Sequence, residues 1–312
     1  PELERLIRPA RVGRPATLIN LAAGVPPPDA TRETTFMPEL IAAGDNRKME
    51  TLLADPVQYT MLLGDERIPL NPHLGRRLRL AYESEIHCIN CGRKTSKSFS
   101  QGYCFPCMRS LAECDSCIVR PETCHFAEGT CRDEEWALAH CMQDHYVYLA
   151  NSSGAKVGIT RGTQIPTRWI DQGASQALPI FRVKNRLLSG KLEHIIRDQI
   201  SDRTDWRRML KGVPEDIDLA ELRNHLLAQL AMPIEMLISE EDDHAIETLM
   251  SEDVVSINYP VEEYPEKVSA LNFDKTHEIH GRLLGIKGQY LILDKGVINI
   301  RKFGGYYVKL SY

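Results

Sequence analysis

The sequence predicts an α+β protein of several units, and three observations lead to this prediction. All nine cysteines of the 312-residue chain lie between Cys88 and Cys141. Residues 146–200 have the pattern strand, strand, helix, strand, helix. The last stretch, of about 35 residues, consists of short β runs broken at glycines, which is typical of a small barrel or curled sheet. We therefore expect a cysteine-rich segment, a central α/β domain and a small C-terminal β-barrel-like domain.

Length and composition set the expected domain organisation. The chain exceeds one average domain, and its composition, 43% hydrophobic and 26% charged, is ordinary for a soluble protein. No apolar run approaches the roughly 18–20 residues of a membrane helix, and no signal sequence opens the chain, so we expect a cytoplasmic protein. The expected segments are a loosely ordered extension (1–43), a β-rich N-terminal part (44–86), a cysteine-rich metal-binding module (87–145), the central domain (146–232), an acidic segment (233–266) and a small basic β domain (267–312).

The N-terminal quarter shows a change in pattern near Asp45. Before it, the Pro26–Pro28 run and the lack of periodicity predict a tail. After it, residues 57–63 and 78–82 are expected to be strands, because turn signals at Gly64–Asp65 and Asn71–Pro72 separate them.

The first four cysteines predict a structural zinc site. Cys88 and Cys91 form one Cys-x2-Cys pair and Cys104 and Cys107 form another, twelve residues later. Each pair presents two sulfurs to one ion, and two pairs complete a tetrahedron without an open position. In the reducing cytoplasm, clustered thiols indicate metal rather than disulfides.

The remaining thiols predict a second metal site with an open choice of ligands. The candidates are Cys114, Cys117, Cys124, Cys131 and Cys141, with His125, His140 and His145 close by in the sequence. Spacing places the Cys114/Cys117 pair in the site but does not select the other two ligands. Zinc and an iron–sulfur cluster both fit four such ligands.

The central domain has the most regular pattern. Residues 146–150 and 156–160 are expected to form a hairpin, because the loop Asn151–Gly154 has turn composition. Pro166 can open a short helix that Gly173 closes, and residues 178–183 are expected to be a strand. Apolar residues from Leu188 to Ile200 then recur at helical spacing. A further helix is expected over residues 219–230, capped by Asp218.

This domain resembles the GIY-YIG endonucleases. The resemblance rests on the hairpin, Val147–Leu149 followed by Lys156–Arg161, and covers about 55 residues. It implies a divalent-metal nuclease site made by Tyr148, Lys156, Arg168 and Glu193. Within that pattern Tyr148 matches the first tyrosine and Gly158 the glycine of the second motif. Glu193 matches the glutamate that holds Mg²⁺ or Mn²⁺, and Lys156 stands where most members have their second tyrosine.

Two functions are compatible with these residues. A metal, a cation for developing charge and an activated water together support phosphodiester hydrolysis. The alternative is a non-catalytic adaptor that binds nucleic acid or a protein. If these residues form no site at all, Glu193 and Arg197 are an ordinary helix-surface pair at i,i+4, Tyr148 belongs to the core, and Arg168 packs beside Trp169.

Charge placement favours nucleic acid as a partner. The net charge is −5, but residues 235–266 contain eleven acidic and no basic side chains, whereas residues 281–312 contain six Lys/Arg and one acid. Basic residues in the loop 92–97 suit phosphates, or they offset the charge of a four-thiolate zinc. Aromatic residues near the C-terminus fit base stacking or a β core. These are Tyr290, Phe303, Tyr306 and Tyr307.

From about Arg47 onward the chain also resembles an uncharacterised bacterial family. The resemblance rests on the cysteine block and on three runs, Lys156–Arg161, Ile165–Gly173 and Gly296–Lys302. It implies membership of that family and no particular activity.

Overall fold

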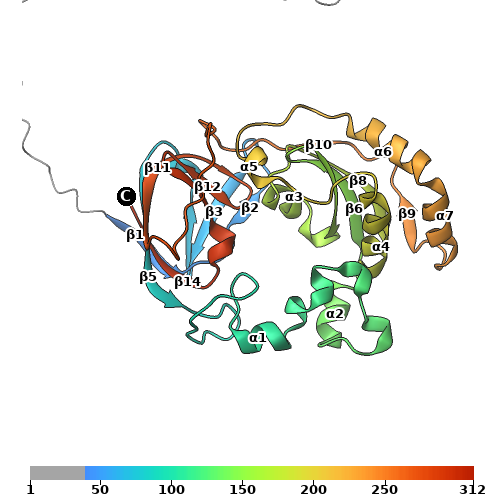
Figure 1. Ribbon diagram of the computed structural model, residues 1–312, viewed down its shortest axis with the longest axis horizontal. Helices are drawn as coiled ribbons and strands as arrows, with labels where there is room; N and C mark the ends of the chain where they lie inside the picture. Colours follow the sequence, from blue (N-terminus) through green and yellow to red (C-terminus); the bar gives the residue numbers. More distant parts are fainter. Residues whose placement is uncertain (1–38) are drawn as a thin grey trace, which may run out of the picture. The chain divides into compact units, whose positions relative to one another are not determined.

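A computed structural model describes residues 39–312, and these residues form a mixed α+β structure with several sheets (Figure 1). The expected extension therefore lies outside the described residues, except for its last residues, which enter the first strand. Contacts place residues 38–312 in one compact unit. Among the described residues, no helix is long and apolar enough to cross a membrane.

A six-stranded antiparallel sheet joins the two ends of the described chain. Its order is β1-β14-β5-β11-β12-β13. The strands are β1 (Leu40–Asp45), β5 (Arg77–Ile86), β11 (Glu278–Lys287), β12 (Tyr290–Leu293), β13 (Gly296–Asn299) and β14 (Tyr306–Ser311). A second, three-stranded sheet contains β2 (Glu50–Leu52), β3 (Gln58–Leu63) and β4 (Glu66–Pro69).

Residues 267–312 do not form a sheet of their own. Strand β14 lies between β1 and β5, and β11 pairs with β5 on its other side. The physical reason is the core. Alternate residues of β3 and β14 are buried, and Tyr59, Met61, Leu80, Phe303 and Leu310 belong to one apolar cluster. The apolar faces of the N-terminal and C-terminal strands cover each other.

The central unit has the element order that the sequence predicts. The elements are β6 (His145–Asn151), β7 (Ala155–Arg161), α3 (Thr167–Asp171), β8 (Gln176–Val183) and α4 (Arg186–Arg197). Asn185 caps α4 by accepting a hydrogen bond from the Leu188 amide at 2.9 Å. The helix expected at 219–230 is α6 (Leu219–Gln229), and Asp218 caps it as expected.

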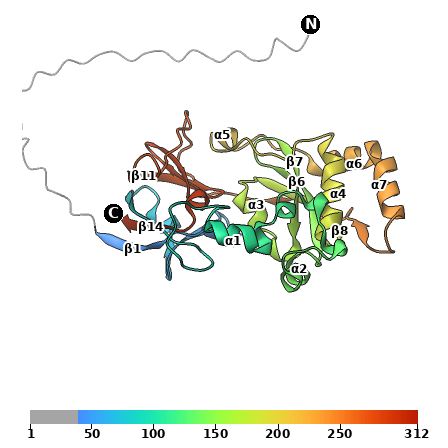
Figure 2. The ribbon, with the colours of Figure 1, turned by 60° about the horizontal axis from the view of Figure 1, so that its bottom comes forward.

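The central sheet separates two sets of helices. Its order is β10-β8-β6-β7, with β9 paired to β8, so that β7 is an edge strand. Three helices pack on one face, and α3 packs on the other (Figures 1 and 2). The three helices are α4, α6 and α7 (Ala231–Ser239). The remaining elements of this unit are α5 (Trp206–Met209), β9 (Ile246–Thr248) and β10 (Val255–Ser256). Side chains from both faces can therefore meet beyond the free edge of β7.

The cysteine-rich segment contains little regular structure. It has two short helices, α1 (Phe105–Ser110) and α2 (Glu134–His140), and several single 3₁₀ turns. One of these turns, Pro121–Thr123, touches α4 at Gly190, where an added Cβ would lie 2.5 Å from the Glu122 amide nitrogen. The absence of a side chain at Gly190 therefore allows the segment to lie directly on α4.

Candidate metal centre and anion-binding cleft

The first two Cys-x2-Cys pairs converge. Cys88, Cys91, Cys104 and Cys107 each offer a sulfur, and the four sulfurs lie within 4.8 Å of one another. The Sγ atoms of Cys91 and Cys104 are 3.8 Å apart. A tetrahedral ion with sulfurs at about 2.3 Å requires sulfur–sulfur separations of about 3.8 Å. The four thiols can therefore hold a metal ion such as zinc.

Backbone amides prepare this site for thiolates. Burial acts to raise the pKa of Cys88, but the N–H groups of Cys91, Cys104 and Asn90 near its sulfur lower that pKa to about 6. The Asn90 side chain also donates to Cys107 Sγ at 3.4 Å. Donors around sulfur are the outer contacts that stabilise a thiolate–metal centre.

The other cysteines are arranged less tightly. Asp115, Cys117 and His125 bring one ligand atom each within 4.8 Å of one another, and Asp115 is also paired with Arg132 at 2.7 Å. Burial first, then Asp115 and the thiols of Cys124 and Cys141, raise the pKa of Cys117 to about 11. Cys131 in turn lies near Cys141.

Cys114 is in neither of these groups. Burial and the neighbouring Glu113 raise its pKa, and so does the thiol of Cys88, which belongs to the first site. The expectation that Cys114 and Cys117 share one ion therefore gains no support from their positions. A second ion, zinc or iron–sulfur, stays a prediction.

A cavity of about 500 Å³ lies at the free edge of β7. Four parts of the fold form its walls: the cysteine-rich segment at Ile118, Val119 and Pro121, the central unit, the turn after β13, and Lys48 between β1 and β2. Its charged lining residues are Lys48, Arg161, Arg168, Asp171, Arg186, Glu193, Asp202 and Arg301. We call this cavity the arginine cleft.

The cleft contains more positive than negative charge. Asp171 is already committed, because its carboxylate lies 2.5 Å from Lys48 Nζ and 4.0 Å from Arg301. In the described part of the chain, Arg161, Arg168 and Arg186 form no ion pair with a carboxylate. Three guanidinium groups that lack an acidic partner and face one cavity suit a phosphate or another polyanion.

Arg168 lies at the centre of this charge. Burial first, and then the nearby Arg168, lower the pKa of Lys156 to about 8. Burial and Arg168 also lower the pKa of Arg186 and of Arg301, although acidic groups and thiols nearby act in the opposite direction. The cations therefore repel one another, and an anion in the cleft would relieve that repulsion.

The four residues predicted from the hairpin lie near one another but differ in exposure. Arg168 and Glu193 line the cleft. Lys156 is 5% exposed and Tyr148 is fully buried, so both lie behind the cleft wall. The pKa values of Tyr148 and Lys156 respond to the charges of Arg168 and Glu193, which shows that the four are neighbours.

Tyr148 and Gly158 pack directly on each other. They are partners in the β6–β7 register, and a Cβ on Gly158 would lie 2.7 Å from the Tyr148 hydroxyl oxygen. No hydrogen bond to that hydroxyl meets ordinary distance and angle limits among the described residues, although the side chains of Gln172 and Arg168 lie close to it. Burial raises the pKa of Tyr148, so its phenol stays protonated.

Two further carboxylates, Glu193 and Asp202, line the cleft besides Asp171. Burial and the neighbouring Asp202 raise the pKa of Glu193 to about 7, against the opposing effect of Lys156 and Arg168. Oxygen ligands of this kind suit Mg²⁺ or Mn²⁺, and a cation between them would remove their repulsion. The pattern of raised and lowered pKa values in one cleft is typical of a functional site.

Sequence reasoning selected two of the eight charged residues of this cleft, Arg168 and Glu193. It did not select Lys48, Arg161, Asp171, Arg186, Asp202 or Arg301 as site residues. The one available signal is the resemblance to the uncharacterised family. Arg161 ends one of the runs on which that resemblance rests, and Arg301 lies within another. Lys48 and Arg301 come from opposite ends of the described chain, and no spacing rule connects them.

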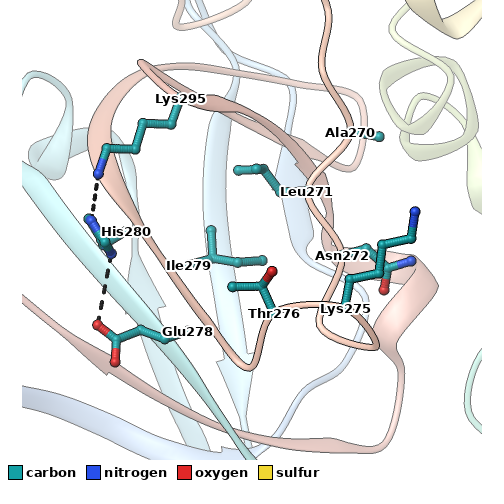
Figure 3. A pocket seen from close by; sticks show the side chains of 9 residues that line it. All are labelled: Ala270, Leu271, Asn272, Lys275, Thr276, Glu278, Ile279, His280 and Lys295. Carbon is teal, nitrogen blue, oxygen red and sulfur yellow. Dashed lines mark hydrogen bonds and ion pairs between the residues drawn. The ribbon is translucent and has the colours of Figure 1, made fainter.

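Another cavity, of about 270 Å³, lies beside β11 and has a different character (Figure 3). His280 stands between Lys295 and Glu278, with Nε2 2.5 Å from the lysine Nζ and Nδ1 3.8 Å from the glutamate (Figure 3). Glu278, His280 and Lys295 are engaged with one another, in contrast to the arginines of the cleft.

The aromatic residues near the C-terminus are mainly structural. Phe303 and Tyr306 belong to the apolar core, and Tyr290 stacks on Trp206 with ring centroids 5.7 Å apart. In the loop 92–97, Lys94 is paired with Glu85 at 2.6 Å. These residues therefore offer less to a ligand than the arginine cleft.

Comparison with known families gave one match. The model of a family described as protein of unknown function (DUF2797) fits residues 75–308. The chain belongs to this family. The DUF2797 match contains the four-cysteine site and most of the cleft, from Arg161 to Arg301, and it confirms the expected uncharacterised family. No curated protein and no solved structure gave a significant match.

Proposed function

We propose that this protein is a zinc-stabilised nucleic-acid-binding protein whose arginine cleft hydrolyses a phosphodiester bond. The observation that carries the proposal is the group of Arg161, Arg168 and Arg186, which face one cavity without an acidic partner in the described chain. Nucleic-acid phosphates are held by such arginines, often through two parallel hydrogen bonds.

The acidic side of the cleft supports the hydrolytic part of the proposal. Glu193 and Asp202 would hold a divalent cation, which supplies Lewis acidity for the phosphate oxygens. Lys156, with a pKa of about 8, lies behind the cleft wall, so it would accept a proton from the attacking water only through a second, bridging water. Arg168 would stabilise the negative charge that develops on the phosphate.

The four-cysteine site has a structural role in this proposal. Its ligands come from two turns, and a closed set of four thiolates leaves no position for a substrate. A structural zinc contributes about 10–16 kcal/mol to the folding of small modules. In the proposed function it fixes the segment that forms one wall of the cleft.

One observation favours the adaptor alternative. The Tyr148 hydroxyl is sealed from solvent, and Lys156 is nearly so. A substrate would reach Arg168 and Glu193 without touching either of them. Binding without cleavage is then the outcome that this observation predicts.

A cleavage assay separates the two functions. Labelled single-stranded and duplex DNA and RNA are incubated with the protein and Mg²⁺ or Mn²⁺, with EDTA as the control. We expect metal-dependent cleavage by the wild type, and its loss in Glu193→Gln with binding and zinc content retained. Binding without cleavage by the wild type would move the assignment to the adaptor. No binding to any of the four nucleic acids would contradict both.

A further inference from the structure

A smaller cavity, of about 240 Å³, lies between the four-cysteine turns and the turn before β14. Three cations face it, namely Arg47, Lys48 and Arg301. Arg47 is exposed and forms no ion pair within residues 39–312. We call this space the zinc-side cavity.

The zinc-side cavity adjoins the arginine cleft. Lys48 and Arg301 line both spaces, so they stand at the boundary between them. The basic residues therefore form a track from Arg47, past Lys48 and Arg301, to Arg168. A single phosphate ion would occupy one part of this track, whereas a strand with consecutive phosphates would use its whole length.

The walls of the zinc-side cavity are not only charged. Ile89 contributes apolar surface and Tyr103 aromatic surface. Ile89 lies between two ligands of the first metal site, and Tyr103 directly precedes a third. The Tyr103 hydroxyl donates to Glu113 at 3.2 Å, which fixes the ring. A flat aromatic or apolar surface beside cations is the combination that binds an unpaired base together with its phosphate.

The backbone around this cavity is held in place from two sides. Ile89 N–H donates to the Gly102 carbonyl at 2.9 Å, and the Ser98 hydroxyl donates to the Gly304 carbonyl at 2.8 Å. Ser100 and Gln101 have φ values of 43° and 67°, in the left-handed region that costs energy for residues with side chains. The cavity is thus a built feature of the fold.

We propose that the zinc-side cavity binds an unpaired nucleobase and the phosphate next to the one held in the arginine cleft. The ligand of this protein is then a single strand of nucleic acid that runs from the four-cysteine turns into the cleft. A base-paired nucleotide cannot place its base in a recessed cavity of this size without leaving the duplex. This inference rests on the proposed function and specifies its substrate class.

The test measures how binding depends on salt. Fluorescence anisotropy follows the binding of a labelled single strand of about twelve nucleotides, a length within the usual range for one single-strand binding site. The strand is tested as DNA and as RNA, and the matching duplex is tested in parallel. The proteins are the wild type, Arg47→Ala and Arg77→Ala. Arg77 is a matched control, because it is exposed, lines neither cavity and lies at the opposite end of β5 from the metal site.

We expect the wild type to prefer the single strand. In Arg47→Ala the slope of log K against log salt should become shallower by about 0.7, the value for one lost phosphate contact on a single strand. Arg77→Ala should keep the wild-type slope. Binding of inorganic phosphate, which needs only the cleft, should be equal in all three proteins.

The outcomes distinguish the two proposals. If the wild type binds strands but Arg47→Ala and Arg77→Ala have the same slope, the zinc-side cavity is not a subsite, and the proposed function stands. A preference for duplex over single strand overturns the inference in the same way. If the wild type binds neither strand nor duplex, the proposed function itself fails, and the inference with it.

Discussion

Gly158→Ala tests the contact between β7 and the buried tyrosine behind the cleft. The new Cβ would lie 2.7 Å from Tyr148 Oη, 2.8 Å from Cζ and 3.2 Å from Cε2. Ordinary contacts to a Cβ begin near 3.4 Å. The ring must therefore retreat by several tenths of an ångström, and Tyr148 is fully buried, so the neighbouring Trp169 must move with it.

Overpacking of this kind costs about 1–3 kcal/mol in the free energy of unfolding. Urea denaturation followed by fluorescence measures that loss against the wild type, at constant m-value. Gly212→Ala is the matched control, because a Cβ at Gly212 meets no atom within 4 Å. We expect the control to be neutral or slightly stabilising, since alanine restricts the unfolded chain.

Equal stability of Gly158→Ala and Gly212→Ala would refute the packing argument. A second variant sharpens the result. Adding Tyr148→Phe to Gly158→Ala removes the nearest of the three atoms, so part of the lost stability should return. No coupling between the two substitutions would show that Tyr148 and Gly158 do not touch.

Three further predictions follow from the site. Tyr148→Phe alone should raise the free energy of unfolding by about 1 kcal/mol, because a buried hydroxyl without a partner is costly. It should leave nucleic-acid binding unchanged. A loss of stability in urea would show that the hydroxyl is hydrogen-bonded. Cys104→Ser should lower both the bound zinc, measured by elemental analysis, and the melting temperature, since a three-thiolate site is open; full zinc content would contradict the assignment. Glu193→Gln should be more stabilising at about pH 7.5 than at about pH 5. The pKa of Glu193 in the folded protein is about 7, above its ordinary value of 4.5, so the folded state binds the carboxyl proton more tightly than the unfolded state does. The wild type therefore loses stability as the pH rises from about 4.5 to about 7. A pH-independent difference between the two proteins would contradict this.

Local patterns in the sequence predicted the central unit well. The element order strand, strand, helix, strand, helix, the capping of α6, and the four-cysteine group depend on residues close in sequence. Turn composition and helical spacing report such local structure directly. The proximity of Arg168 and Glu193 was expected from the resemblance to GIY-YIG endonucleases and not from any spacing rule.

Long-range pairing could not be predicted in the same way. Strand β14 pairs with β1 and β5, more than 200 residues earlier, and short amphipathic strands carry no signal for the identity of their partners. The same limitation concealed Lys48 and Arg301 as neighbours of Asp171. The shared ion of Cys114 and Cys117 stays a prediction, because spacing does not determine the direction in which a side chain points in an irregular turn.

The most direct test of the account is the affinity of Arg168→Ala for a labelled single strand, measured beside Arg77→Ala at the same salt concentration. Arg168 lies at the centre of the cleft charge, and a charged hydrogen bond contributes about 1.5–3 kcal/mol. We predict that Arg168→Ala weakens binding roughly tenfold to a hundredfold, with unchanged zinc content and melting temperature. Equal affinity of the two variants would contradict the claim that the arginine cleft binds nucleic acid.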